Sequence, residues 1–189
     1  MIVRTITNAI LLKSDAIIVV VEKNEKSQIE RIVKQYVKNK NIFFENVEDN
    51  NPIKSCSTYL EEIDPFEDVL VLVGNMPKLS FYTLNTFIKW DNSNDSRILS
   101  IRMNNPSGND RLFRDERFNF LEIKREIECN KEEFKNKYIH SGVSLIKNFK
   151  ILELEAKEFD NILNKMNPSI YMVEPIHYKE FLKVFSRKT

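Results

Sequence analysis

Several predicted strands are followed by polar or small residues, and these are the residues best placed to bind a ligand. Gly74 and Asn75 come directly after an apolar, β-branched strand, and Glu122, His140 and Gly142 lie in or beside later strands. Open α/β sheets bind ligands beyond the carboxyl ends of their strands. Amide, carboxylate and imidazole groups can recognise a polar ligand there by hydrogen bonding. We therefore expect any ligand to bind near strand ends such as those at Gly74, Asn75 and Glu122.

The sequence offers less support for nucleophilic chemistry or for a phosphate-binding loop. Cys56 and Cys129 have no visible base nearby, and they are too few and too far apart to indicate a disulfide framework or a zinc site. The chain has only three glycines, at positions 74, 108 and 142. Close backbone approach to phosphate usually requires glycine, so we expect any ligand to bind without a glycine-rich cradle.

Each polar side chain of the predicted site also has a purely structural explanation. Asn75 can cap the turn that begins at Gly74, because asparagine tolerates turn conformations. His140 can be an ordinary half-buried histidine. Glu122 can belong to a solvated strand edge beside Lys124. These alternatives remain open from the sequence.

Hydrophobic periodicity assigns the elements that must position these residues. Helices are predicted at Thr5–Lys13, Ser27–Lys38, Thr58–Ile63, Ser80–Trp90 and Lys157–Met166, and strands at Ala16–Glu22, Asn41–Glu45, Asp68–Val73, Arg97–Met103 and Ile139–Leu145, with a hairpin formed by Leu112–Arg114 and Phe118–Ile123. The mixed-charge run Glu126–Lys137 is expected to be a solvated helix or loop. Alternating strands and helices predict a three-layer, Rossmann-like α/β fold, with a mostly parallel sheet and helices on both faces.

Length and composition narrow the class of protein. A chain of 189 residues suits one compact domain, which we expect to span residues 1–189. Lys and Arg total 29 against 28 for Asp and Glu, so no net field would hold nucleic acid or an anionic membrane nonspecifically. The longest apolar run, Ala16–Val21, is too short to span a membrane, and Met1–Arg4 does not resemble a secretory signal. We therefore expect a cytoplasmic protein with no membrane partner.

Four segments, in matching order and spacing, resemble the uridylyltransferase domain of N-acetylglucosamine-1-phosphate uridyltransferases. They are DVLVLVGNMPKL with the following helix start (Asp68–Leu84), NPSGNDR (Asn105–Arg111), EIKRE (Glu122–Glu126) and IHSGV (Ile139–Val143). The family counterparts are a strand ending in Tyr-Gly-Asp-Val-Pro-Leu, the turn Asp-Pro-Thr-Gly-Tyr-Gly-Arg, the segment Glu-His-Lys-Asp, and Ile-Asn-Thr-Gly-Ile. Met1–Glu22 is similar to the helix and strand after the family's nucleotide loop. The resemblance implies a nucleotide-diphospho-sugar transferase-like fold over nearly the whole chain.

The resemblance also implies a binding site formed by Gly74, Asn75, Glu122, His140 and Gly142, and roles for some of these residues. In this family a sugar phosphate attacks the α-phosphate of a nucleoside triphosphate, and magnesium neutralises the developing charge. Glu122 and His140 would approach the sugar. Asn75 stands where the family has a magnesium-binding carboxylate, so it would be at most a weak metal ligand, because its amide oxygen is neutral. The second metal ligand corresponds to Phe185, which cannot bind a metal.

Further departures affect the same implied site. The family's uracil-contacting Gly-Thr-Gly turn corresponds to Asn51–Lys54, the second Gly of the sugar turn is Asp110, and the chain begins after the point where the Gly-rich loop would lie.

We therefore expect a catalytically impaired relative, a pseudoenzyme, that binds a nucleotide or nucleotide sugar or serves as a partner subunit in a homo- or hetero-oligomer. Two alternatives remain open. The first is an active, magnesium-dependent UDP-N-acetylglucosamine pyrophosphorylase, which transfers uridylyl from UTP to N-acetylglucosamine 1-phosphate and is represented by an incomplete chain. The second is a structural protein that keeps only the fold.

Overall fold

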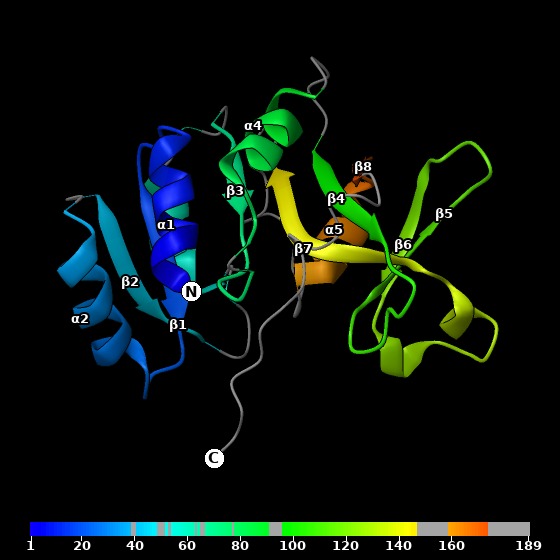
Figure 1. The fold of residues 1–189 in the computed structure, drawn as a ribbon, viewed down its shortest axis with the longest axis horizontal. Coiled ribbons are helices and arrows are strands. Elements are labelled where there is room, and N and C mark those ends of the chain that lie inside the picture. Colours follow the sequence, from blue (N-terminus) through cyan, green and yellow to red (C-terminus); the bar gives the residue numbers. More distant parts are fainter. Residues whose placement is uncertain are drawn as a thin grey trace.

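The computed structural model describes residues 1–38, 41–48, 52, 54–62, 64, 67–76, 78–90, 96–146 and 159–173. The elements are α1 (Ile2–Leu11), β1 (Ile17–Val21), α2 (Lys26–Tyr36), β2 (Ile42–Asn46), η1 (Lys54–Cys56), α3 (Ser57–Glu62), β3 (Val69–Val71), α4 (Phe81–Lys89), β4 (Arg97–Arg102), β5 (Arg111–Arg114), β6 (Phe120–Lys124), η2 (Glu126–Glu128), η3 (Glu133–Lys135), β7 (Tyr138–Ile146), α5 (Phe159–Met166) and β8 (Ser169–Val173) (Figure 1). Within these ranges, no helix combines the length and the apolar character needed to cross a bilayer.

The strands of the described residues form a mixed arrangement. β1 and β2 pair in parallel, and the larger sheet has the order β6-β5-β7-β4-β8, with β3 also pairing with β7. In the larger sheet only β4 and β8 are parallel, whereas β3, β4 and β5 each run antiparallel to β7, and β5 runs antiparallel to β6. The prediction of a mostly parallel sheet is therefore wrong. No α-helix separates β4, β5, β6 and β7 in the chain, and antiparallel neighbours do not need a crossover helix.

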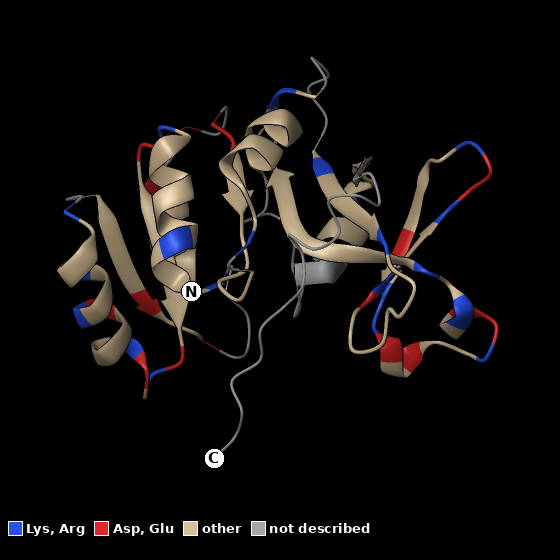
Figure 2. Ribbon diagram, viewed as in Figure 1, with Lys and Arg blue, Asp and Glu red and all other residues tan. Residues whose placement is uncertain are grey.

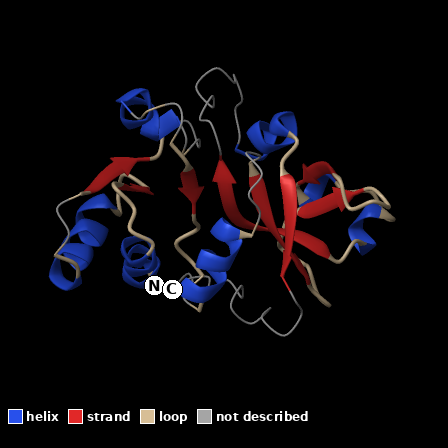
Figure 3. Cartoon of the chain, turned by 90° about the horizontal axis from the view of Figure 1, so that it is seen from above, coloured by secondary structure: helices blue, strands red, loops and turns tan. Residues whose placement is uncertain are grey.

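Helices cover both faces of the strands, as the sequence predicted (Figure 3). In β1, Val19 packs with Ile6 of α1 and Val33 of α2, whereas Val20 packs against Leu60 of α3. Neighbouring residues of a strand face opposite sides, so α1 and α2 cover one face and α3 covers the other.

The larger sheet is covered in the same way. Phe87 of α4 packs in one buried cluster with Leu99 of β4, and Leu163 of α5 packs in another with Ile98 of β4. These four side chains are fully buried. The expected three-layer α/β arrangement is therefore present, although its sheet is mixed.

Most predicted elements lie within a few residues of their observed positions, with informative differences. Ser80 caps α4 by accepting a hydrogen bond of 3.1 Å from the backbone N–H of Thr83, as its position predicted. α2 begins at Lys26, one residue before the predicted start at Ser27, and has no side-chain cap. β3 is short, half-buried and antiparallel, rather than the fully buried parallel strand expected, and β8 was not predicted.

The segment between β6 and β7 forms a charged lobe with the β5–β6 hairpin. Its Lys and Arg residues alternate with Asp and Glu residues (Figure 2). Exposed ion pairs such as Lys135 with Glu132, at 2.8 Å, connect positions within the lobe. Pairs of this kind stabilise a fold by only about 0–1 kcal/mol. The lobe therefore agrees with the solvated segment expected at Glu126–Lys137, which contains two short 3-10 helices.

A bulge at Gly142 bends β7 against the end of β3. Ile98 pairs with Ser144 and Ser100 pairs with His140, so β7 advances four residues while β4 advances two. Gly142 has a φ of 83°, and a Cβ at this position would lie 2.7 Å from Cγ1 of Val73. Glycine is therefore required here both for the backbone conformation and for close packing.

Replacing Gly142 by alanine should destabilise the protein by about 3 kcal/mol, because the Cβ adds overpacking to the strain of a positive φ. Gly108 is a matched control, since its φ is 76° and no atom lies within 4 Å of a Cβ built there. Gly108→Ala should cost only about 1 kcal/mol. Urea denaturation measures both free energies of unfolding. Equal losses would show that the packing against Val73 adds nothing.

Candidate functional site

Gly74 and Asn75 continue β3 toward the N-terminal end of α1. A Cβ at Gly74 would lie 3.1 Å from Cδ1 of Ile2, the first residue of that helix. The buried side chain of Asn8 in α1 donates a hydrogen bond of 2.7 Å to the carbonyl of Leu79. These contacts fix the loop after β3 against α1. The first backbone N–H groups of a helix carry partial positive charge, so this end of β3 lies in a favourable field for an anion.

Asn75 carries a side-chain oxygen that is buried and has no hydrogen-bond partner within the described residues. An unsatisfied buried oxygen costs about 1–3 kcal/mol, and a donor on a ligand could remove that cost. The oxygen is neutral, however, and magnesium prefers carboxylates. In the described part of the chain, no three His, Cys, Asp or Glu side chains gather to hold a metal. Asn75 itself therefore offers magnesium a weaker ligand than a carboxylate would.

Two other predictions from the sequence concern residues that lie partly or wholly outside the described ranges. Phe185 lies in the undescribed range 174–189, so its suggested position near Asn75 stays a prediction. Of the segment Asn51–Lys54, only Pro52 and Lys54 are described.

Glu122 lies on β6, at the edge of the larger sheet. Its carboxylate is 3.5 Å from the ammonium of Lys124, and its side chain is 45% exposed. Lys124 lies closer to Glu133, at 2.7 Å, and the hydrogen bond with Glu133 is the main reason why the pKa of Lys124 is raised. This environment is the solvated strand edge that the sequence allowed as an alternative.

His140 is buried within β7. Its Nε2 lies 3.1 Å from Oγ of Ser144, and its backbone N–H donates a hydrogen bond of 3.2 Å to the carbonyl of Asp110. The imidazole therefore contributes to the hydrogen bonding of the sheet interior.

The pairing of β5, β6 and β7 places Glu122 and His140 on opposite faces of the sheet. Arg111 pairs with both Ile139 and Lys124, so these three side chains share one face. Glu122 is two residues from Lys124 and shares that face, whereas His140 follows Ile139 directly and faces the other side. The structure does not bring Glu122 and His140 together.

The remaining predicted residues do lie close to one another. Val73 contacts the bulge at Gly142, and Gly74 and Asn75 follow Val73 directly in the chain. The ends of β3 and the bend of β7 therefore share one location, beside the N-terminal end of α1.

Arg111 organises the turn that precedes β5, although the sequence patterns did not single it out. Its side chain is fully buried. Its guanidinium donates to the carbonyl of Pro106 at 2.8 Å and to the carbonyl of Asn109, and it forms an ion pair of 2.7 Å with Glu126. One side chain thus fixes both ends of the turn.

Glu126 completes this arrangement from the segment after β6. It accepts a hydrogen bond of 2.8 Å from the backbone N–H of Gly108. That bond, followed by the interactions with Arg111, lowers the pKa of the Glu126 carboxyl below its ordinary value of 4.5. The ion pair could have been anticipated from the predicted β5–β6 hairpin. In a hairpin, the residues that follow the second strand lie beside the turn that precedes the first strand.

No family model matches the chain. A protein of Acanthamoeba polyphaga mimivirus named probable UDP-N-acetylglucosamine pyrophosphorylase is 29% identical over 180 residues, which cover 92% of this chain and 68% of that protein. The bifunctional protein GlmU of Pseudothermotoga lettingae is 34% identical over 94 residues, which cover 49% of this chain and 21% of that protein. The chain is thus similar in sequence to sugar nucleotidyltransferases, and to UDP-N-acetylglucosamine pyrophosphorylases among them.

Solved structures agree with this family at the level of the fold. HddC from Yersinia pseudotuberculosis aligns with 90% of this chain and 74% of its own length, with a TM-score of 0.62 and 15% identity. A Bacillus anthracis protein described as a glucose-1-phosphate thymidylyltransferase aligns with 92% of this chain and 74% of its own length, with a TM-score of 0.65 and 11% identity. The α/β nucleotidyltransferase-like fold predicted from the sequence is confirmed.

Glu126→Gln should reduce stability at neutral pH and should have little effect in acid. The folded pKa of Glu126 is lowered, so its stabilising contribution is present above the unfolded pKa and is lost as the pH falls through the folded value. The free energies of unfolding of the variant and the original protein should therefore converge below pH 4.5. Denaturant titrations over a pH series measure this difference.

The matched control is Glu132→Gln, which removes a carboxylate of the same lobe whose side chain is 81% exposed. It should change stability by less than about 0.5 kcal/mol at every pH. A similar pH profile for both variants would contradict a specific role for the pair with Arg111.

Proposed function

We propose that this sugar nucleotidyltransferase-like protein binds a nucleotide or nucleotide sugar at the end of β3 and is impaired in catalysis. The observation that carries the proposal is Asn75, a neutral amide shortly after that strand, whose side-chain oxygen is buried without a partner among the described residues. Nucleotidyl transfer builds up negative charge on phosphoryl oxygens, and a metal normally neutralises it. Binding without efficient transfer is the expected result.

Three features favour retained binding of a nucleotide or nucleotide sugar at this position. The N-terminal end of α1 favours phosphate through its partial positive charge. The unpartnered oxygen of Asn75 can accept a hydrogen bond from a hydroxyl or N–H group of the ligand. The contacts of α1 with Gly74 and Leu79 hold the loop in place, which limits the entropy lost on binding.

An active UDP-N-acetylglucosamine pyrophosphorylase is the second candidate function. It is favoured by the mimivirus relative, whose name states that activity and whose alignment covers 92% of this chain. The two candidates share the location of the ligand and differ in whether a uridylyl group is transferred.

Ligand-dependent thermal denaturation tests the binding part of the proposal. At a concentration about 100 times the dissociation constant, UTP or UDP-N-acetylglucosamine should raise the melting temperature by roughly 5–10 °C, because a ligand that prefers the native state stabilises it by about 2.7 kcal/mol. Asn75→Leu should reduce the shift, and Asn24→Leu, at an exposed turn position, should not. Absence of any shift with either ligand would leave a structural protein as the explanation.

A turnover assay tests the impairment. With UTP, N-acetylglucosamine 1-phosphate and magnesium, the protein should release no pyrophosphate above background. Asn75→Asp supplies a carboxylate, so magnesium should strengthen UTP binding by that variant about tenfold, which corresponds to 1.4 kcal/mol. Pyrophosphate release by the unmodified protein would instead establish the pyrophosphorylase activity.

A further inference from the structure

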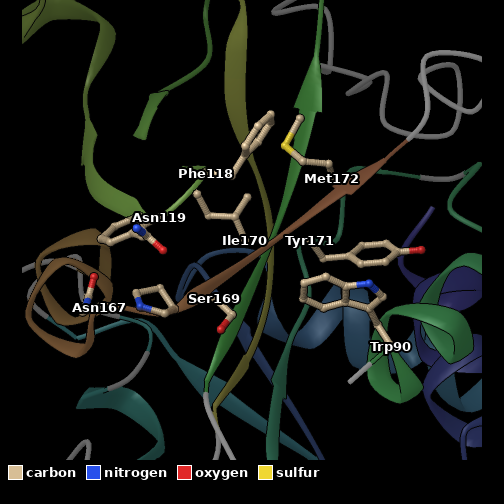
Figure 4. Close-up of a pocket in the computed structure, with 10 residues that line it drawn as sticks. Trp90, Phe118, Asn119, Asn167, Ser169, Ile170, Tyr171 and Met172 are labelled. Carbon is tan, nitrogen blue, oxygen red and sulfur yellow. The ribbon is translucent and has the colours of Figure 1, made fainter. Parts of the chain in front are cut away.

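A hollow of about 610 Å³ lies along the outer side of β8, between the end of α4 and the turn of the β5–β6 hairpin (Figure 4). Its size is in the range of small-ligand sites. None of its ten lining residues is Asp, Glu, Lys, Arg or His, although 30% of the whole chain is charged. The lining therefore suits an uncharged ligand.

Aromatic rings form one end of this β8 hollow. Trp90, at the end of α4, is 46% exposed, and its ring centroid lies 5.1 Å from that of Tyr171 in β8, with an angle of 66° between the ring planes. Figure 4 shows the two rings on the same side of β8. They present a large apolar surface that remains partly open to solvent.

Neutral hydrogen-bonding groups form the other end. Figure 4 shows the side chains of Asn119 and Asn167 away from Trp90, at the start of β8, whereas the side chain of Ser169 lies on the same side of the strand as Trp90. Asn119 uses its amide nitrogen in a hydrogen bond of 2.8 Å to Asp115. Amide and hydroxyl groups can donate and accept hydrogen bonds without charge. A ligand that spans the hollow would therefore contact rings at one end and neutral polar groups at the other.

Phe118 borders the hollow in an unfavourable backbone conformation. Its φ is 68°, in a turn closed by a hydrogen bond from the N–H of Asp115 to the carbonyl of Asn119. Glycine is the residue favoured at such a position, and a bulky residue is strained there. The ring is nevertheless 58% exposed, and the guanidinium of Arg114 stacks on it at 3.8 Å. The turn therefore keeps an exposed aromatic ring beside the hollow at an energetic cost.

We propose that the β8 hollow binds a neutral carbohydrate chain, at a second site independent of the proposed nucleotide site. Sugar rings have C–H faces that pack on aromatic rings and hydroxyl groups that bond to amides. A nucleotide would find no cationic side chain in this lining to pair with its phosphates. A purely apolar ligand would make no use of the neutral polar groups of Asn167 and Ser169. The carbohydrate satisfies both ends of the hollow.

Trp90 is the single tryptophan of the chain, so its fluorescence reports directly on this site. The full chain is titrated with three neutral probes, maltohexaose, cellohexaose and chitohexaose. At least one should give a saturable fluorescence change below about 10 mM. Phe118→Gly should weaken that binding about tenfold through loss of the ring. Glycine also relieves the positive φ, so this variant should remain folded, which urea denaturation checks.

Tyr82→Ala is the matched control, because this residue of α4 is 74% exposed and does not line the hollow. Its binding should equal that of the unmodified protein. Three results would each overturn the proposal: no saturable change with any probe, equal binding by folded Phe118→Gly, or displacement of the bound probe by UTP. The thermal shift with UDP-N-acetylglucosamine tests the nucleotide site separately, so either site can fail without the other.

Discussion

The close approach of β7 to the end of β3 is the contact on which the remaining arrangement depends. β7 pairs with β3, β4 and β5, so its path sets the positions of three neighbouring strands. Its bend at Gly142 is possible because no Cβ separates the backbone from Val73. The same contact places the residues after β3, including Asn75, beside α1. A side chain at position 142 would alter the sheet and the candidate site together.

The local elements could be predicted because their signals are local. The apolar period of α4 and its cap at Ser80 are written within a dozen residues, and the structure has both. Strand direction is different, because it depends on which distant segment becomes the neighbour. The apolar run of β3 suits a buried parallel strand equally well, yet its partner β7 runs antiparallel. β8, at Ser169–Val173, was not predicted, although β1 and β2 of the same length were.

The same distinction applies to the candidate site. Asn75 could be located because it follows a strand, and the end of β3 needs only local information. The relative position of Glu122 and His140 could not be predicted. The face of the sheet on which each side chain lies depends on the pairing of Arg111 with both Ile139 and Lys124. The ion pair of Arg111 with Glu126 joins two segments across the hairpin, and no local sequence motif predicts such a pair.

Under the proposed function, an amide in place of a carboxylate would separate two properties that a nucleotidyltransferase normally combines. Binding can use groups that do not require a metal, such as the N–H groups at the start of α1 and the oxygen of Asn75. Transfer requires neutralisation of the charge that develops on the phosphoryl oxygens, and dipoles alone supply less of it than a divalent cation. An amide at position 75 would therefore reduce the stabilisation of the transition state more than that of the bound ground state. On this proposal, the difference between the two states, rather than a loss of the fold, would let the protein keep its ligand while losing the reaction.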